Sequence, residues 1–421
     1  MSLLSLPPEI IDKICKLFCS HCQTEPLSHF PHEQDLVTSC PSKIWEHDAQ
    51  GVKALLNLSE TCQALNTLTL PHRYHRIELK SDLLYTKEFI AHARGRRQNA
   101  LNYVRSLSLA YTKEIDDCYN QLPDSIKPRF DFFNMVLRHV PQIQILRLRL
   151  NLDHEIKVPT TLESLRYLHI ERAHEEADDS PPSLHIYDVL RQAPKIHTLV
   201  IQVTRFSWSF GSGELENVKS LKLVNTVVMP EFLEKILESC PQLESFAFIF
   251  FKKMRDWLDL GVSDITMPRT LPHVLSLRQE TLRYVELYWE PYIPWRSQAG
   301  IVGCFKGLTN LETLILGGPG FFFEEDENYK PFKTCLVDLL PQSIRRVAID
   351  SEMLSLHEPI FELGEAVKRG AFPMLKEARC YHGEFEGWTV LEGTSTGPSV
   401  TRQEAKLGAT GTRPHAIYYR S

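Results

Sequence analysis

The 421-residue sequence contains no uninterrupted apolar run near the ~20 residues that a membrane-spanning helix needs. Its first residues, MSLLSLPPEIIDKICKLFC, are apolar but lack the basic start of a secretory signal, and two prolines and the charged Glu9, Asp12 and Lys13 interrupt them. We therefore expect a protein of the cytoplasm, the nucleus or both.

An excess of positive charge is also missing, since the formal net charge is −6 at pH 7. Nucleic-acid-binding domains usually carry a basic footprint, so the composition argues against that role. The sequence has no GxSxG, Walker-type phosphate loop, HExxH or dinucleotide fingerprint, and its histidines and acids lack the paired spacing of a general acid–base site. We expect no enzymatic activity, no cofactor, and neither nucleic acid nor membrane among the partners.

The ten cysteines are scattered too irregularly to form a disulfide framework. One stretch is rich in possible metal ligands: Cys15, Cys19, His21, Cys22, His29, His32, Cys40 and His47. Zinc needs about four ligands, usually in paired short spacings, and after the pair Cys19 and Cys22 no second CxxC or HxxxH follows. Because Cys15 and Cys19 also fit one helix face, we interpret these residues as ordinary helix and loop residues and expect no metal site.

The first 80 residues show two helical patterns. Leu6-Pro7-Pro8-Glu9 is typical of a helix start, because proline is tolerated in the first turn and Glu9 complements the helix dipole. An apolar stripe follows at helical spacing: Ile10, Ile11, Ile14, Leu17 and Phe18. A second helix is predicted from Ala54 to Leu70, ending at Pro71, with the stripe Leu55, Leu58, Cys62, Leu65 and Leu68. Between them, residues 21–51 read as a surface excursion with one short helix near Trp45.

Beyond about residue 100 the chain repeats one pattern. Three segments carry it most clearly: LRHVPQIQILRLRL from Leu137, LRQAPKIHTLVIQV from Leu190 and LESCPQLESFAFIF from Leu237. Each ends in an alternating apolar strand, which buries only one face and needs a neighbouring unit to cover it. Looser copies complete the series of expected strand centres: Leu107, Leu146, Leu168, Leu199, Leu221, Phe246, Val285, Leu314 and Val347. Helices are predicted at Phe130–Val140, Tyr187–Gln192, Glu231–Ser239, Cys335–Leu340 and Pro359–Arg369.

The N-terminal patterns, in this order and ahead of such repeats, resemble the F-box, especially its divergent fungal type. The residues that carry the resemblance are Leu6, Pro7, Glu9, Ile10, Ile14, Leu55, Leu58, Ser59, Cys62, Leu65, Pro71, Tyr74 and Ile77–Leu79. The repeats resemble those of F-box proteins with degenerate leucine-rich repeats, most closely at Cys240-Pro241-Gln242-Leu243. The resemblance implies an α/β chain with three parts: an F-box-like helical module at 1–80 with an insertion at about 20–51, a leucine-rich-repeat solenoid at 81–390 with helices on its convex side, and a flexible tail at 391–421.

The resemblance also implies a function, which is substrate recognition for an SCF-type cullin ubiquitin ligase. The F-box would dock a Skp-type adaptor, and through it the cullin, while the repeats hold the target protein. The adaptor contacts carried over from the family are Leu6, Pro7, Glu9, Ile10, Ile14, Leu55, Leu58, Cys62 and Leu65. The inserted segment departs from the family, whose first two helices are joined by a short turn. The alternative is an interaction scaffold outside any ligase, whose N-terminal helices only cap the solenoid.

Alternate residues on each strand face away from the expected core. We call the face that they form the outer strand face, and its predicted partner-binding residues are Arg147, Arg149, His169, Gln202, Lys222, Ile249 and Tyr288. Its first half is basic, which would suit an acidic ligand, although these residues could equally be a solvated surface. Two aromatic insertions, Trp289–Trp295 and Phe321–Glu327, are each open to two interpretations, as an interface or as a satellite cluster packed under a loop.

Overall fold

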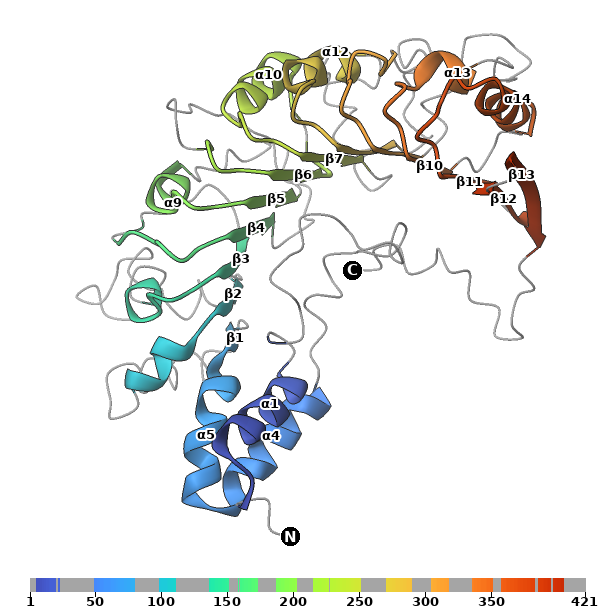
Figure 1. Cartoon of the computed structure of the whole chain (residues 1–421). Helices are drawn as coiled ribbons and strands as arrows, with labels where there is room; N and C mark the ends of the chain where they lie inside the picture. Colours follow the sequence, from blue (N-terminus) through green and yellow to red (C-terminus); the bar gives the residue numbers. More distant parts are fainter. Residues whose placement is uncertain are drawn as a thin grey trace. The chain divides into compact units, whose positions relative to one another are not determined.

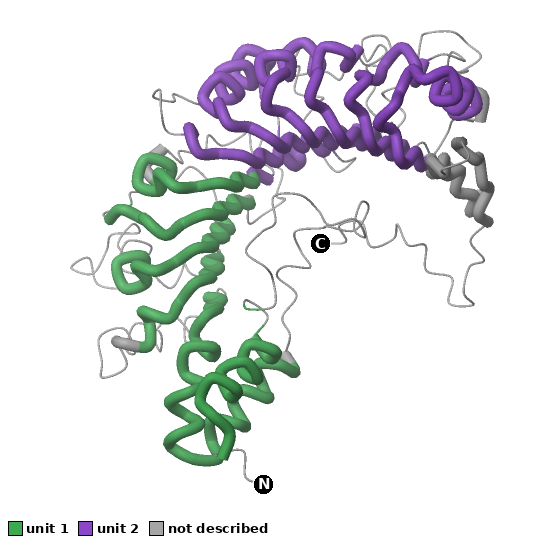
Figure 2. Tube along the Cα trace, in the orientation of Figure 1, with its two compact units in different colours: residues 1–200 green, residues 201–421 purple. Residues whose placement is uncertain are grey.

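The computed structural model is an α/β fold whose chain divides into two compact units, residues 1–200 and 201–421 (Figures 1 and 2). The residues that it describes are 5–19, 22, 49–79, 98–110, 136–150, 158, 160–172, 187–202, 215–226, 228–250, 270–289, 304–317, 335–350, 357–382, 385–394 and 397–404. Among these residues, no helix has both the length and the apolar character needed to cross a bilayer.

The first unit begins with three mutually packed helices, α1 (Pro8–Phe18), α4 (Ala49–Thr61) and α5 (Gln63–Tyr74). Helix α1 starts as predicted, with proline in its first turn and Glu9 beside the N-terminus. A buried cluster joins the three helices: Ile11, Cys15, Cys19, Leu55 and Leu65. These helices therefore have an apolar core of their own.

The prediction of one helix from Ala54 to Leu70 is wrong in two respects. The chain breaks at Cys62, whose backbone is extended (φ −165°, ψ 164°), so two helices form where one was expected. Just before the break, the hydroxyls of Ser59 and Thr61 donate to the carbonyls of Leu56 and Leu58, bonds that compete with the helical pattern. Pro71 lies inside α5 rather than after it. Because proline has no N–H, α5 lacks the helical hydrogen bond from residue 71 to the carbonyl of Thr67.

The strands of the first unit follow the chain in order and run parallel where their pairing is described: β1 (Arg76–Leu79), β2 (Ser106–Ala110), β3 (Ile145–Leu150) and β4 (Tyr167–Arg172). The next strand, β5 (Thr198–Gln202), begins in the first unit and ends in the second. Their central leucines are aligned, since Leu107 pairs with Leu146 and Leu146 with Leu168. Two further helices, η2 (Gln98–Tyr103) and α9 (Tyr187–Gln192), precede β2 and β5.

A backbone ladder explains the regular spacing of these strands. The N–H of Gln144, just before β3, donates to the carbonyl of Arg105 at 2.7 Å, and the N–H of Arg166 donates to the carbonyl of Gln144 at 2.8 Å. In the second unit the N–H of Arg283 donates in the same way to the carbonyl of Glu244 at 2.8 Å. Each repeat thus satisfies the polar backbone of its neighbour at the turn into the strand.

The second unit continues the pattern. Its parallel strands are β6 (Ser220–Val224), β7 (Ser245–Phe250), β8 (Tyr284–Trp289), β9 (Thr313–Gly317), β10 (Arg346–Asp350) and β11 (Glu377–His382), and two antiparallel strands follow, β12 (Phe385–Thr394) and β13 (Gly397–Glu404). The helices of this unit are α10 (Pro230–Glu238), α12 (Leu271–Leu275), η5 (Ser276–Arg278), α13 (Cys335–Leu339) and α14 (His357–Lys368). Helices α10, α12, α13 and α14 lie on one side of the parallel strands (Figure 1).

All nine predicted strand centres lie in strands, and four predicted helices match α9, α10, α13 and α14 within two residues at each end. Of the predicted helix Phe130–Val140, residues 136–139 are helical and residues 130–135 lie outside the described part. The repeats were expected to end near residue 390 and a flexible tail to follow. This boundary is wrong, because β12 crosses it and β13 pairs with β12 as far as Glu404. Residues 405–421 lie outside the described part.

Candidate functional site

Helix α1 carries apolar side chains on two faces. Ile11, Cys15 and Cys19, spaced four residues apart, point into the helical core. A second stripe, Ile10, Ile14, Leu17 and Phe18, lies on another side of the same helix. Ile10 is 40% exposed and Leu17 66% exposed. Exposed leucine and isoleucine are common singly, but a stripe of them at helical spacing is typical of a docking surface.

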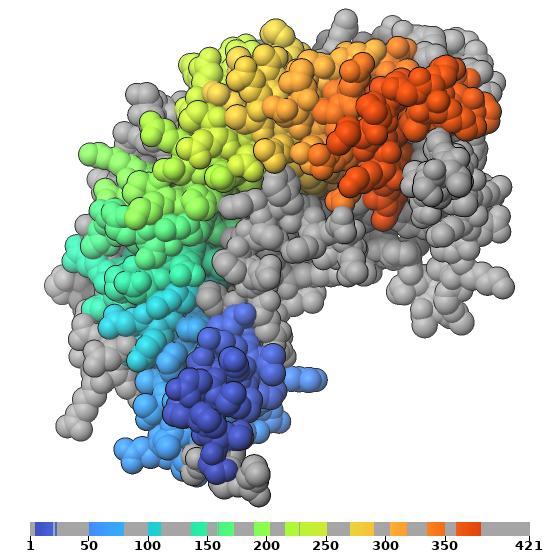
Figure 3. Space-filling view, viewed as in Figure 1, coloured from blue at the N-terminus to red at the C-terminus, as the bar shows by residue number. Residues whose placement is uncertain are grey.

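Helix α4 adds two more exposed apolar side chains, Val52 (39%) and Leu56 (38%), one turn apart. We call the exposed apolar residues of α1 and α4, together with the half-buried Ile14, the helical docking surface: Ile10, Ile14, Leu17, Phe18, Val52 and Leu56. Figure 3 shows the surface of these N-terminal helices in blue. This surface is part of the first unit alone.

The predicted adaptor contacts are distributed differently. Pro7, Glu9 and Ile10 are exposed, Leu6, Ile14, Leu58 and Cys62 are half-buried, and Leu55 and Leu65 are buried. Leu55 and Leu65 belong to the helical core and not to the exposed surface, and their assignment as adaptor contacts stays a prediction. Sequence reasoning missed Val52 and Leu56, because the apolar stripe of α4 points inward and these two residues lie beside it. Leu17 and Phe18 were recognised as apolar face residues but not as contacts.

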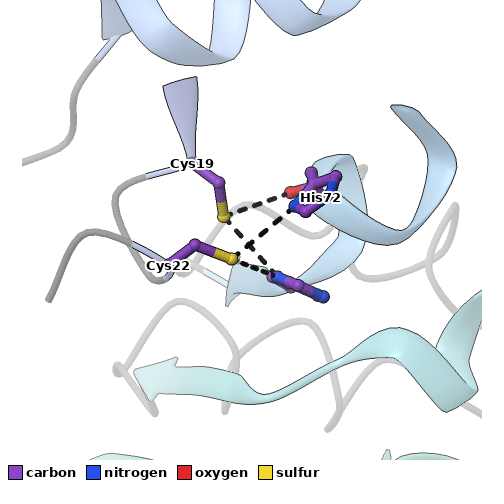
Figure 4. A group of neighbouring side chains, drawn as sticks. Cys19, Cys22 and His72 are labelled. Carbon is purple, nitrogen blue, oxygen red and sulfur yellow. Dashed lines mark hydrogen bonds between the residues drawn. The ribbon is translucent and has the colours of Figure 1, made fainter. Parts of the chain in front are cut away.

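Two cysteines and two histidines converge where α1 and α5 end. Cys19 caps the C-terminus of α1, Cys22 follows it, His72 lies in the last turn of α5, and His75 caps α5. One ligand-type atom from each residue lies within 4.8 Å of the other three. Figure 4 shows the sulfurs of Cys19 and Cys22 pointing toward His72. We call these four residues the Cys/His cluster.

The distances inside the cluster are short and similar. The Nδ1 atom of His75 lies 3.6 Å from Sγ of Cys19 and 3.2 Å from Sγ of Cys22. The Nδ1 atom of His72 lies 3.6 Å from Sγ of Cys22. The two imidazole rings meet edge to face, with their centroids 5.1 Å apart. The cluster is thus a compact group of two sulfur and two nitrogen donors.

Asp12, in the first turns of α1, contacts this cluster through the Nε2 atom of His72. Its Oδ1 lies 2.9 Å from Nε2 of His72, and its Oδ2 lies 2.8 Å from Nζ of Lys16. The Lys16 ammonium and then His72 hold the pKa of Asp12 below its usual value. Burial lowers the pKa of His72, but hydrogen bonds to Cys19 and Asp12 outweigh it, so the pKa of His72 is raised.

The two thiols affect each other strongly. The pKa of Cys19 is lowered because Cys22 donates a hydrogen bond to it, and His72 and His75 lower it further. The pKa of Cys22 is raised because it is that donor, and burial disfavours a second thiolate beside the first. A second thiolate in this place would therefore need a compensating positive charge.

The described neighbours of Cys19 and Cys22 lie outside the stretch from Cys15 to His47 that the sequence marked as rich in metal ligands. In that stretch, His21, His29, His32, Cys40 and His47 lie outside the described residues. The actual neighbours are His72 and His75, an HxxH pair at the end of α5. That spacing is neither CxxC nor HxxxH, the two patterns on which the expectation of no metal site was based.

The outer strand face is aligned as predicted. Arg147 pairs in register with His169, and Arg149 with Glu171. In the second unit Lys222, Ala247, Glu286 and Ile315 form one row across β6 to β9, and Val224, Ile249, Tyr288 and Gly317 form the next row. The alternation along each strand thus predicted correctly that these residues lie on the same face of the sheet. Gln202, another predicted residue of this face, is half-buried.

Acidic neighbours offset part of the positive charge predicted for the first half of this face. Glu171 accepts hydrogen bonds from Arg147, including one from Nε at 3.1 Å, and lies 3.7 Å from Nε of Arg149. Glu286 lies 3.6 Å from Nζ of Lys222. An acidic ligand would have to compete with these carboxylates.

Several residues of the outer strand face are not exposed. His169 and Ile249 are buried. Ile249 joins Val224 and Ala247 in a small apolar cluster against which Tyr288 packs. The second half of the face is therefore largely apolar apart from Glu286, and Tyr288 and Ile315 are half-exposed there.

Comparison of the sequence with protein-family models gives no match, and comparison with curated protein sequences gives none either. Function must therefore be inferred from the described side chains. Most of the inserted segment, residues 20, 21 and 23–48, lies outside them, as do residues 290–295 of the first aromatic insertion and all of the second, Phe321–Glu327. Trp289 is described, and it stacks on Phe250 with ring centroids 4.9 Å apart, which fits a satellite cluster.

Proposed function

We propose that the chain is a substrate-recognition adaptor of an SCF-type cullin ubiquitin ligase. In this proposal the helical docking surface binds a Skp-type adaptor, and the strand repeats, which we interpret as degenerate leucine-rich repeats, bind the protein to be ubiquitinated. Such a receptor performs no chemistry itself. It raises the local concentration of substrate lysines near the ubiquitin-conjugating enzyme.

The observation that carries the proposal is the second apolar face of α1. A helix that only packed on α4 and α5 would need one apolar face, yet Ile10 and Leu17 remain exposed beside the buried Ile11 and Cys15. Burying a side chain such as Leu17 contributes about 1.5–3 kcal/mol relative to leaving it exposed. The stripe on α1, extended by Val52 and Leu56, could therefore supply much of the free energy of binding to a partner.

The repeats support the second half of the proposal. Their strands align one residue of each repeat beside the next, as in the row from Lys222 to Ile315. Such rows give a partner a series of side chains at regular spacing. Tyr288 is the aromatic side chain of this face that stays half-exposed, and aromatic residues are enriched at binding hot spots.

The proposal is tested by calorimetric titration of the full chain with a purified Skp-type adaptor. Leu17→Glu places a charge in the middle of the stripe, and we expect it to weaken binding at least tenfold. Leu277→Glu is the matched control, because Leu277 is a 42% exposed leucine of η5 in the other unit. The control should bind like the unaltered chain. Absence of binding by the folded, unaltered chain would refute the proposal.

Leu17→Glu tests adaptor binding more specifically than the double variant Leu6→Ala and Pro7→Ala would. Leu6 packs against the helical core, so its truncation would weaken the fold together with any docking surface. Leu17 does not belong to that core. Circular dichroism of the Leu17→Glu variant should therefore match that of the unaltered chain.

A second candidate function is an interaction scaffold outside any ligase. It is favoured by the contacts of α5 with η2 and with β1, which show the N-terminal helices packed against the first strand repeat. A solenoid end needs such a cap. The two functions differ in the titration, since a scaffold would bind target proteins but not the adaptor.

A further inference from the structure

We propose that Cys19, Cys22, His72 and His75 bind one zinc ion in a closed tetrahedral site. The inference rests on the geometry of the Cys/His cluster alone. It is independent of adaptor binding, so either proposal could fail while the other holds.

The donor spacing matches that of zinc. Zinc–sulfur bonds of about 2.3 Å and zinc–nitrogen bonds of about 2.0 Å in a tetrahedron separate sulfur from nitrogen by roughly 3.5 Å. Three of the four sulfur–nitrogen pairs in the cluster are 3.6, 3.6 and 3.2 Å apart. A metal ion could thus enter with small side-chain adjustments, because the four donor atoms all lie within 4.8 Å of one another.

His72 is oriented as a metal ligand. Its Nε2 faces Oδ1 of Asp12 at 2.9 Å, and its Nδ1 faces Sγ of Cys22. A hydrogen bond from Nε2–H to the carboxylate leaves the lone pair on Nδ1, which then points at the proposed metal position. Histidines that bind metals commonly donate their other N–H to a carboxylate in this way.

The donor set and its surroundings favour zinc held for structural reasons. Two thiolates neutralise a divalent cation, which allows the site to be buried, and the side chain of His72 is only 3% exposed. Two sulfur and two nitrogen donors in a tetrahedron select zinc among the common divalent ions. Four protein ligands leave no open position for water or substrate, so the site is not built for catalysis.

The position of the site indicates what the metal would do. Cys19 and His75 cap the C-termini of α1 and α5, so zinc would fasten the two helix ends together. Cys22 and His72 are 50 residues apart in the sequence, so the metal would cross-link distant parts of the chain. A cross-link that closes a long loop lowers the entropy of the unfolded chain, and zinc would stabilise the three-helix module in this way.

The first test is the metal content of the untagged full chain, purified under reducing conditions and dialysed without chelator. We expect one zinc ion per chain. Cys22→Ser and His75→Asn should each abolish it; both side chains are half-buried, which makes these changes mild. The matched controls Cys62→Ser and His139→Asn alter half-buried residues of the first unit outside the cluster and should keep full zinc content.

The second test identifies the ligands directly and does not require a variant to fold. X-ray absorption at the zinc edge of the full chain should show two sulfur and two nitrogen neighbours, and Co²⁺ substituted for zinc should give the visible absorption of a tetrahedral thiolate site. The proposal is overturned if the reduced chain binds neither Zn²⁺ nor Co²⁺. A disulfide between Cys19 and Cys22 that persists in reductant, or metal binding that both ligand variants retain, would overturn it as well.

Discussion

The imidazole of His72 lies between two helices, with Nε2 2.9 Å from Oδ1 of Asp12 on α1 and Nδ1 turned toward the sulfur of Cys22. Asp12 is itself shared, because its other oxygen lies 2.8 Å from Nζ of Lys16. The carboxylate therefore connects Lys16 on the surface of α1 with the buried His72 of the Cys/His cluster.

This relationship predicts the effect of Asp12→Ala on metal affinity. Removing the carboxylate deprives Nε2–H of its acceptor and frees the ring of His72 to turn, so zinc affinity should fall about 10–100-fold. Competition with a coloured chelator measures the affinity. Lys16→Ala serves as the control, since it removes the other partner of Asp12 and leaves the contact with His72. Equal losses in both variants would contradict the role of Asp12.

Gly317 is predicted to be intolerant of any side chain. A Cβ atom there would lie 2.2 Å from Cδ2 of Tyr288, its neighbour on β8. Gly317→Ala should therefore displace the Tyr288 ring and cost about 1–3 kcal/mol, the usual range for overpacking. Urea unfolding of the full chain measures this loss. Gly307→Ala, where nothing lies within 4 Å of the added atom, should be close to neutral.

A double variant separates the clash from other effects of the alanine. If Tyr288 is the obstacle, Gly317→Ala should cost much less in a chain that already carries Tyr288→Ala. Equal costs in the two backgrounds would show that the ring is not what restricts Gly317.

Glu171 is predicted to contribute more to the free energy of unfolding than an exposed acidic residue in an ion pair does. Glu171→Gln removes the charge shared by Arg147 and Arg149, and a hydrogen bond to a charged group contributes about 1.5–3 kcal/mol. Urea unfolding should therefore show a clear loss of stability. The control is Glu163→Gln, whose pair with Lys195 is exposed on both sides and should contribute at most about 1 kcal/mol. If Glu163→Gln lowered the free energy of unfolding as much as Glu171→Gln, the stabilising role of Glu171 would be contradicted.

The strands could be predicted because burial on one face forces alternation. Leu107, Leu146 and Leu168 repeat at the centre of such patterns and stack in register. Strand β11 was missed because Glu377–His382 contains little apolar alternation and is specified by pairing with β10. The break at Cys62 was missed because the apolar stripe continues through it, so periodicity alone does not mark the change from α4 to α5.

The candidate sites were harder to predict, because each depends on which residues meet in space. Helical periodicity shows that α1 is apolar, but only packing separates the inner Ile11 from the outer Ile10. A helix ending at Pro71 would have left His72 and His75 in a connecting segment, with no reason to join Cys19. Arg147 and Glu171 lie in adjacent repeats, and only the register of β3 with β4 brings their charges together.

Docking of the Skp-type adaptor on α1 and α4 is the central claim, and hydrogen exchange of the full chain with and without saturating adaptor tests it most directly. The account predicts slower amide exchange in Pro8–Phe18 and Ala49–Thr61 on adding the adaptor, and unchanged exchange in the strands of the second unit. Slower exchange confined to the strands, or no change in any part of the chain, would contradict the claim.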